Sequence, residues 1–141
     1  MPLIYRAMIV DGDGRPKVAP TSRGLGVRVP PAAKPDITPD AAGLVKPGTG
    51  GMSVSPNWRD LPYWLIPARL SHLVYGAIGR DDAACFRMGD GPFASGPVTV
   101  GLDLRVDGPT HGLVEPASET AVADYQQALA DTRDEWTVDE S

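Results

Sequence analysis

The glycine-rich stretch at residues 46–56, KPGTGGMSVSP, combines hydroxyl groups with a backbone that a ligand could approach closely. Gly50 and Gly51 follow Thr49 and permit backbone angles that other residues avoid. The alternation of apolar and polar residues after them predicts a half-buried strand that presents Ser53 on one side. The stretch is neither a P-loop, which needs Lys-Ser/Thr directly after its last glycine, nor a dinucleotide fingerprint, which opens a long helix. Two interpretations stay open: a ligand-binding loop, and an ordinary turn that feeds a strand.

A second group of reactive side chains lies at residues 110–116, THGLVEP. The pattern predicts a strand on which His111 and Glu115 share one face. A histidine exchanges a proton near neutral pH, and a carboxylate can stabilise a developing positive charge. The two residues could therefore form a site, or they could be two polar side chains on an edge strand.

Arg6 is the one charged residue in the apolar run of residues 3–10, which predicts a central strand. A guanidinium in such a strand needs an ion-pair partner, a place at the strand end, or an opening into a cleft.

Three aromatic residues, Trp58, Tyr63 and Trp64, follow the glycine-rich stretch closely. They could stack on a planar ring such as nicotinamide or adenine, or they could belong to the core.

Composition narrows the classes of function. The net charge is −5 and the basic residues form no cluster, which argues against nucleic-acid binding through the phosphate backbone. The single cysteine, Cys85, excludes an internal disulfide and a cysteine-based zinc site. The DGDG turn at residues 11–14 lacks the glutamate that completes a calcium loop, because residue 22 is a serine. We expect no metal.

The distribution of apolar residues along the sequence bears on the cellular location of the protein. No apolar run approaches the ~18 residues of a membrane span, and the first residues lack the layout of a signal peptide. We therefore expect a cytoplasmic protein with no membrane partner.

The expected architecture is a single α+β domain over residues 1–141. Strands are predicted at residues 3–10, 24–29, 52–55, 84–88 (as an edge strand), 98–106 (the clearest of all) and 110–116, which forms a hairpin with the strand before it. Helices are predicted at residues 67–79 and 117–136, the second with Ser118 as its N-cap. The acidic tail at residues 138–141 is expected to fray.

Three separated motifs carry a resemblance. They are Tyr5-Arg6-Ala7, then Gly43-Leu44 with Thr49-Gly-Gly-Met-Ser-Val54, and finally Thr110-His111-Gly-Leu-Val114-Glu-Pro116-Ala117 before a closing helix. In order and content they resemble the ADP-ribosyltransferase-like toxins whose founding member is a small cytotoxic effector of a bacterial type VI secretion system.

The resemblance implies a compact α+β domain with a split β-sheet and a C-terminal helix, with NAD as the substrate. It implies that Arg6 anchors the pyrophosphate or a ribose, that Ser53 lies on the floor of the nicotinamide pocket, and that His111 orients a ribose or the reacting centre. Glu115 is the candidate for the carboxylate that stabilises the ribose cation. The expected NAD-binding residues are Arg6, Thr49, Gly50, Gly51, Trp58 and Tyr63.

Two functions are open on this basis. The first is an NAD-consuming toxin or modifying enzyme that cleaves the nicotinamide–ribose bond, either by transfer to a macromolecular acceptor or by hydrolysis. It would act in the cytoplasm of the producing or a target bacterial cell and would have a cognate immunity protein. The second is a non-catalytic module of the same fold that binds a nucleotide or a protein. The chain has no Glu-x-Glu signature, so the sequence leaves the reaction open.

Overall fold

Antiparallel strands in three sheets make up most of the regular secondary structure in the computed structural model, which describes residues 1–141. In the first sheet, β1 (Ile4–Ile9) pairs with β4 (Ala83–Met88), which pairs in turn with β9 (Thr137–Val138). The second sheet has the order β3 (Met52–Val54), β7 (His111–Pro116), β6 (Leu102–Gly108) and β5 (Gly96–Thr99). β2 (Leu44–Val45) and β8 (Thr120–Ala121) form a two-stranded ribbon.

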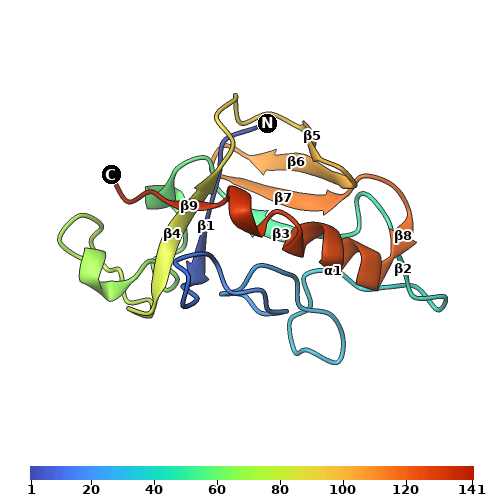
Figure 1. The fold of residues 1–141 in the computed structure, drawn as a ribbon, viewed down its shortest axis with the longest axis horizontal. Coiled ribbons are helices and arrows are strands. Elements are labelled where there is room, and N and C mark those ends of the chain that lie inside the picture. The colour runs from blue at the N-terminus through green and yellow to red at the C-terminus, as the bar shows by residue number, and fades with distance from the viewer.

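The first two sheets meet at one point. Figure 1 shows β1 and β4 running across the direction of β6 and β7. Tyr5 and Ser55 exchange backbone hydrogen bonds of 2.8 and 3.0 Å, which join β1 to the residue directly after β3. This junction holds the middle of β1 against the end of β3, and the candidate site lies beside it.

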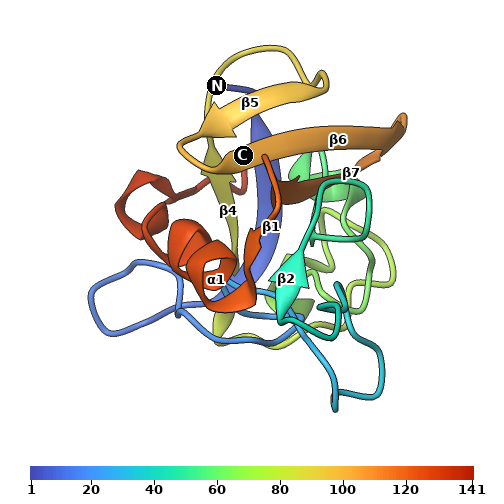
Figure 2. The same ribbon diagram turned by 90° about the vertical axis from the view of Figure 1, so that its right-hand side faces the viewer.

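Strand β1 is buried on both faces, as its apolar sequence predicts. Ile4 and Met8 belong to a core of 18 buried residues, which also contains Tyr125 and Leu129 from α1 (Val122–Ala130). Tyr5 and Ala7 of β1 belong to a second core of eight buried residues around Trp58. Figure 2 shows α1 lying under the second sheet and alongside β1 and β4, where it covers the larger core.

The α+β class is therefore confirmed, with mostly antiparallel sheets and one C-terminal α-helix. The strands expected at residues 3–10, 52–55, 84–88 and 110–116 are present as β1, β3, β4 and β7. β4, however, is the central strand of its sheet and not an edge strand, because β9 pairs with its second side.

The clearest predicted strand, residues 98–106, is wrong as a single element. It is a hairpin in which β5 turns into β6 at Val100 and Gly101. Val100 is 91% exposed and Gly101 has a φ of 79°, the left-handed conformation that favours glycine. Alternation continues on both sides of the turn, so the apolar pattern by itself does not reveal it.

Both predicted helices also differ from the structure. Residues 67–79 contain one 3-10 turn, η2 (Ala68–Leu70), because hydrogen bonds from Ala68 to Gly79 and from Gly79 to Ile66 close the segment into a loop. The C-terminal helix begins at Val122, with Ala121 as its N-cap, because β8 uses the residues before it for pairing. A separate 3-10 turn, η3 (Arg133–Glu135), follows the helix. Residues 24–29 form no strand.

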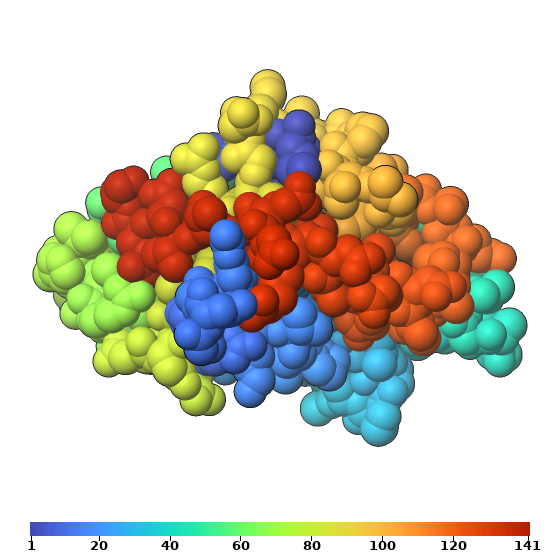
Figure 3. All heavy atoms as spheres, viewed as in Figure 1, coloured from blue at the N-terminus to red at the C-terminus, as the bar shows by residue number.

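The acidic tail, expected to fray, lies against β4 and the second core. Asp139 accepts a hydrogen bond from the Tyr5 hydroxyl at 2.8 Å, and Arg69 pairs with Glu140 at 2.7 Å. Figure 3 shows the C-terminal residues packed against the loop at residues 11–20. The bonds to this loop come from residues just before the tail: Arg133 forms an ion pair of 2.6 Å with Asp13, and Arg15 donates to the carbonyl of Trp136 at 2.7 Å.

Candidate functional site

A cavity of about 360 Å³ lies beside the junction of β1 and β3. Arg6 of β1, Ser53 of β3 and His111 at the start of β7 all line it. The three residues are far apart in the sequence, and the antiparallel pairing of β3 with β7 and the Tyr5–Ser55 junction bring them together. The three residues that the resemblance assigns to one NAD site therefore line a single cavity.

Arg6 is 5% exposed, and its guanidinium contacts backbone carbonyls and no carboxylate. Nη1 donates to Ser53 at 2.8 Å, Nε donates to Gly24 at 3.1 Å, and Nη2 donates to Thr21 and Gly26 at 3.3 and 3.5 Å. Burial lowers the pKa of Arg6 to about 10, and the charge of Asp36 partly offsets that shift. Neither the expected ion pair nor a strand-end position explains this residue. It fixes the loop at residues 21–26 over β3, and one of its five N–H groups keeps no protein partner.

Two further cations line the cavity. Arg28 holds Asp36 through Nη2–Oδ1 at 2.9 Å and Nε–Oδ2 at 3.2 Å, and the backbone N–H of Arg28 donates to the same carboxylate at 2.7 Å. Lys34 forms no ion pair. Three cationic side chains therefore face one carboxylate, and the wall of the cavity carries a net positive charge.

His111 has a defined partner. Its Nδ1 lies 2.6 Å from Oδ1 of Asp107, and both side chains are about half exposed. A carboxylate at Nδ1 favours the tautomer that carries its proton on this nitrogen, which leaves Nε2 as an acceptor. His111 is therefore arranged to accept a proton at the edge of the cavity.

Glu115 lies outside the cavity. It is 5% exposed, and its Oε2 accepts hydrogen bonds from the backbone N–H of Gly48 at 2.8 Å and from Nε of Arg105 at 3.0 Å. Glu115 shares a strand face with His111, but four residues of β-strand separate them by roughly 13 Å. The position of Glu115 serves the glycine-rich loop.

The glycine-rich loop packs its backbone closely against other backbone segments of the protein. The N–H of Gly51 donates to the carbonyl of Asp36 at 3.1 Å, and a Cβ on Gly51 would lie 2.6 Å from the carbonyl oxygen of Val114. A Cβ on Gly50 would overlap the carbonyl oxygen of Asp36. Thr49 donates to the carbonyl of Lys46 at 2.7 Å. None of Thr49, Gly50 and Gly51 lines the cavity.

The aromatic residues divide between the two interpretations. Trp58 is 2% exposed and donates from Nε1 to the carbonyl of Ser141 at 2.9 Å, so it is a core residue. Tyr63 and Trp64 are about half exposed and contact each other edge to face at 5.1 Å. Only Trp64 lines the cavity.

Sequence reasoning missed Arg28, Lys34 and Asp36 as site residues. They lie in the proline-rich segment before the glycine-rich stretch, where no periodicity marks a direction for any side chain. The one signal available was the length of that irregular segment, because long loops in small domains often carry binding residues.

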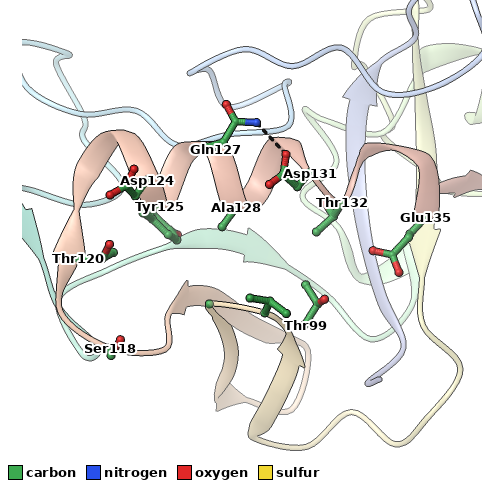
Figure 4. A pocket seen from close by; sticks show the side chains of 12 residues that line it. Thr99, Ser118, Thr120, Asp124, Tyr125, Gln127, Ala128, Asp131, Thr132 and Glu135 are labelled. Atoms are coloured by element: carbon green, nitrogen blue, oxygen red, sulfur yellow. Dashed lines mark hydrogen bonds between the residues drawn. The ribbon is translucent and has the colours of Figure 1, made fainter.

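A second hollow of about 360 Å³ runs along α1 and differs in charge. Figure 4 shows Asp124, Asp131 and Glu135 around it, with Gln127 donating to Asp131 at 2.8 Å. No lysine, arginine or histidine lines this hollow, so it is unsuited to an anionic substrate. The cavity at Arg6 is therefore the candidate site.

Comparison with known proteins adds no assignment: no family model matches the chain, and no curated protein matches its sequence. No group of three histidine, cysteine, aspartate or glutamate residues is placed to hold a metal ion. None of the helices has the length and apolar character needed to cross a membrane.

Proposed function

We propose that the protein binds NAD in the cavity at Arg6 and cleaves its nicotinamide–ribose bond, passing ADP-ribose to water or to a macromolecular acceptor. One observation carries the proposal. Arg6, Ser53 and His111, which belong to the three motifs of the resemblance, line a single cavity with a net positive wall. On this proposal the protein acts in the bacterial cytoplasm, and a cognate immunity protein is a further partner.

Charge and shape support the binding step. The pyrophosphate of NAD carries about two negative charges, and Lys34, Arg28 and the remaining N–H of Arg6 supply positive charge and donors for it. The half-exposed ring of Trp64 is available to stack on a planar base. The hydroxyl of Ser53 is free to bond the amide of nicotinamide.

The chemistry follows from the same residues. The bond between ribose C1′ and the nicotinamide nitrogen breaks, its electron pair leaves with nicotinamide, and positive charge develops on the ribose. Asp36 is the one carboxylate that lines the cavity, so it takes the electrostatic part that the sequence assigned to Glu115. Water or an acceptor hydroxyl then attacks C1′ and gives its proton to Nε2 of His111, while Asp107 stabilises the resulting imidazolium.

Release of nicotinamide from NAD by the purified protein tests the proposal. We expect His111→Ala to lower the rate about a hundredfold or more. The matched control is His72→Ala, because His72 is the one other histidine, is exposed and lies outside the cavity. A parent protein that neither releases nicotinamide nor labels any component of a bacterial lysate would refute the enzyme.

A non-catalytic NAD-binding module is the second candidate. The ion pairs of the two candidate carboxylates favour this function. Asp36 pairs with Arg28 and Glu115 pairs with Arg105, so neither carboxylate is free to stabilise a positive charge on the ribose. Calorimetric titration with NAD separates the two functions. Saturable binding that Lys34→Gln weakens, without any release of nicotinamide, would establish the module.

A further inference from the structure

A third hollow, of about 410 Å³, lies on the other side of the loop at residues 19–24. It is distinct from the cavity at Arg6, although Ser22 contributes to both. Its charged lining consists of Lys17, Arg23, Arg80 and Asp82. Nothing in the proposed NAD chemistry uses this hollow.

Backbone hydrogen bonds build the framework of the hollow. The N–H of Ile9 donates to the carbonyl of Arg23 at 2.7 Å, and the N–H of Lys17 donates to the carbonyl of Ile9 at 2.9 Å. The residue that follows β1, Val10, donates to the carbonyl of Asp82 at 2.9 Å. The first two bonds place Lys17 and Arg23 along one edge of the end of β1, and the third places Asp82 at the opposite edge, where β4 pairs.

The positive charge in this hollow exceeds the negative charge. Asp82 is held by Arg80 through two contacts of 2.9 and 2.6 Å. Neither Lys17 nor Arg23 forms an ion pair, although the whole chain has more acidic than basic residues. Two positive charges therefore face this hollow without a partner.

Donors in this hollow also lack acceptors. The guanidinium of Arg23 makes one hydrogen bond, from Nη2 to the carbonyl of Trp64 at 3.4 Å, and its Nε is buried without a partner. Buried donors without an acceptor are rare in folded proteins. The backbone N–H groups of Ser22 and Arg23 also donate to no group of the protein. A ligand rich in acceptors and negative charge would satisfy the two backbone N–H groups, whereas Nε of Arg23 is closed off from solvent.

We propose that this hollow is an oxyanion site that binds a phosphate group. The ammonium of Lys17 and the fork of Arg23 suit a dianion, and guanidinium donors match the spacing of phosphate oxygens. Thr21 and Ser22 line the same hollow, and each carries a hydroxyl that can donate to a phosphate oxygen. The phosphate belongs either to free inorganic phosphate or to a small phosphate ester, because the hollow is larger than one phosphate group.

Titration of ¹⁵N-labelled protein with inorganic phosphate at pH 7.5, against sodium chloride of equal ionic strength, tests the proposal. We expect saturable shifts of the Ser22 and Arg23 amide signals. Lys17→Gln should weaken the binding about fivefold or more, since it removes one charge-assisted contact. Lys46→Gln is the matched control, because Lys46 is exposed, pairs with Glu119 and lies outside the hollow.

A second titration with adenosine monophosphate distinguishes the two sources of the phosphate. Tighter binding of the ester identifies a phosphate ester as the ligand, and equal affinities identify free phosphate. The proposal is overturned if these amides do not shift, if the shifts occur at Ser53 and His111 instead, or if Lys17→Gln binds phosphate as the parent does. Arg23→Gln repeats the test should Lys17→Gln be poorly folded. All these results are independent of whether the protein cleaves NAD.

Discussion

Replacement of Arg6 by lysine tests how the structure uses a charge inside an apolar strand. Lysine keeps the positive charge but presents its donors from one nitrogen, whereas Arg6 reaches four carbonyls in two different segments. The ammonium can replace at most one of the two short bonds, those to Ser53 and Gly24. The loop at residues 21–26 would then lose its main connection to β3.

The magnitude follows from the hydrogen bonds. One short charge-assisted bond is lost, which contributes about 1.5–3 kcal/mol. The two longer bonds, at 3.3 and 3.5 Å, add less because hydrogen bonds weaken at that length. We therefore expect Arg6→Lys to lower the free energy of unfolding by about 2–4 kcal/mol. With a urea dependence of about 2 kcal/mol per molar, the middle of the usual range, the midpoint of unfolding should fall by roughly 1–2 M.

Urea unfolding followed by tryptophan fluorescence measures this shift. The matched control is Arg59→Lys, because Arg59 is exposed and makes a single side-chain hydrogen bond, to Leu73 at 3.1 Å. Its midpoint should stay within about 0.3 M of the parent, as expected for a surface substitution. Equal midpoints for Arg6→Lys and the parent would refute the role that we derive for Arg6 in fixing the loop. If the midpoints are equal, a lower rate of nicotinamide release by Arg6→Lys than by the parent, measured at low urea, would report a change in substrate binding alone.

Three further predictions concern the glycine-rich loop, the hairpin and the buried thiol. Gly50→Ala should lower the free energy of unfolding in urea by several kcal/mol, because the new Cβ would overlap the carbonyl oxygen of Asp36. Gly43→Ala is the control: its φ is also positive, at 78°, but no atom lies near its Cβ, so it should cost only about 1 kcal/mol. Leu102→Asp should abolish the thermal unfolding transition, because the Leu102 side chain is fully buried. Val100→Asp should unfold at the same temperature as the parent, because Val100 is 91% exposed. Loss of the transition in Val100→Asp but not in Leu102→Asp would refute the hairpin. Burial raises the pKa of the Cys85 thiol from 9.0 to about 12. The folded protein therefore holds this proton more tightly than the unfolded chain, and the free energy of unfolding should fall as the pH rises from 9 to 12. Unfolding measured across that range should show a shallower decline for Cys85→Ala, and parallel curves would contradict the assignment.

Local sequence determined those strands whose pattern has one physical solution. The run from Ile4 to Ile9 is apolar on both faces, and a strand buried between two cores is the structure that satisfies it. Arg6 interrupts that run, so the sequence marked it for a special environment, although not for bonds to backbone carbonyls. The alternation around Ser53 likewise predicted β3.

Tertiary structure decided where the same pattern permits two outcomes. Apolar alternation at residues 98–106 is compatible with one long strand or with a hairpin, and the pairing of β6 with β7 selects the hairpin. Helical spacing at residues 67–79 gives way to a loop, because backbone bonds between its ends replace those of a helix. Intrinsic propensity is too weak to resist such contacts.

The candidate site divides in the same way. His111 and Glu115 share a strand face, and the two-residue alternation of a strand gives no reason to assign one of them, rather than the other, to a site. Only the neighbouring segments distinguish them, since the first borders the cavity at Arg6 and the second binds the loop at Gly48. Arg28 and Asp36 enter the cavity from an irregular segment, where side-chain direction depends on contacts distant in sequence and therefore on the folded chain.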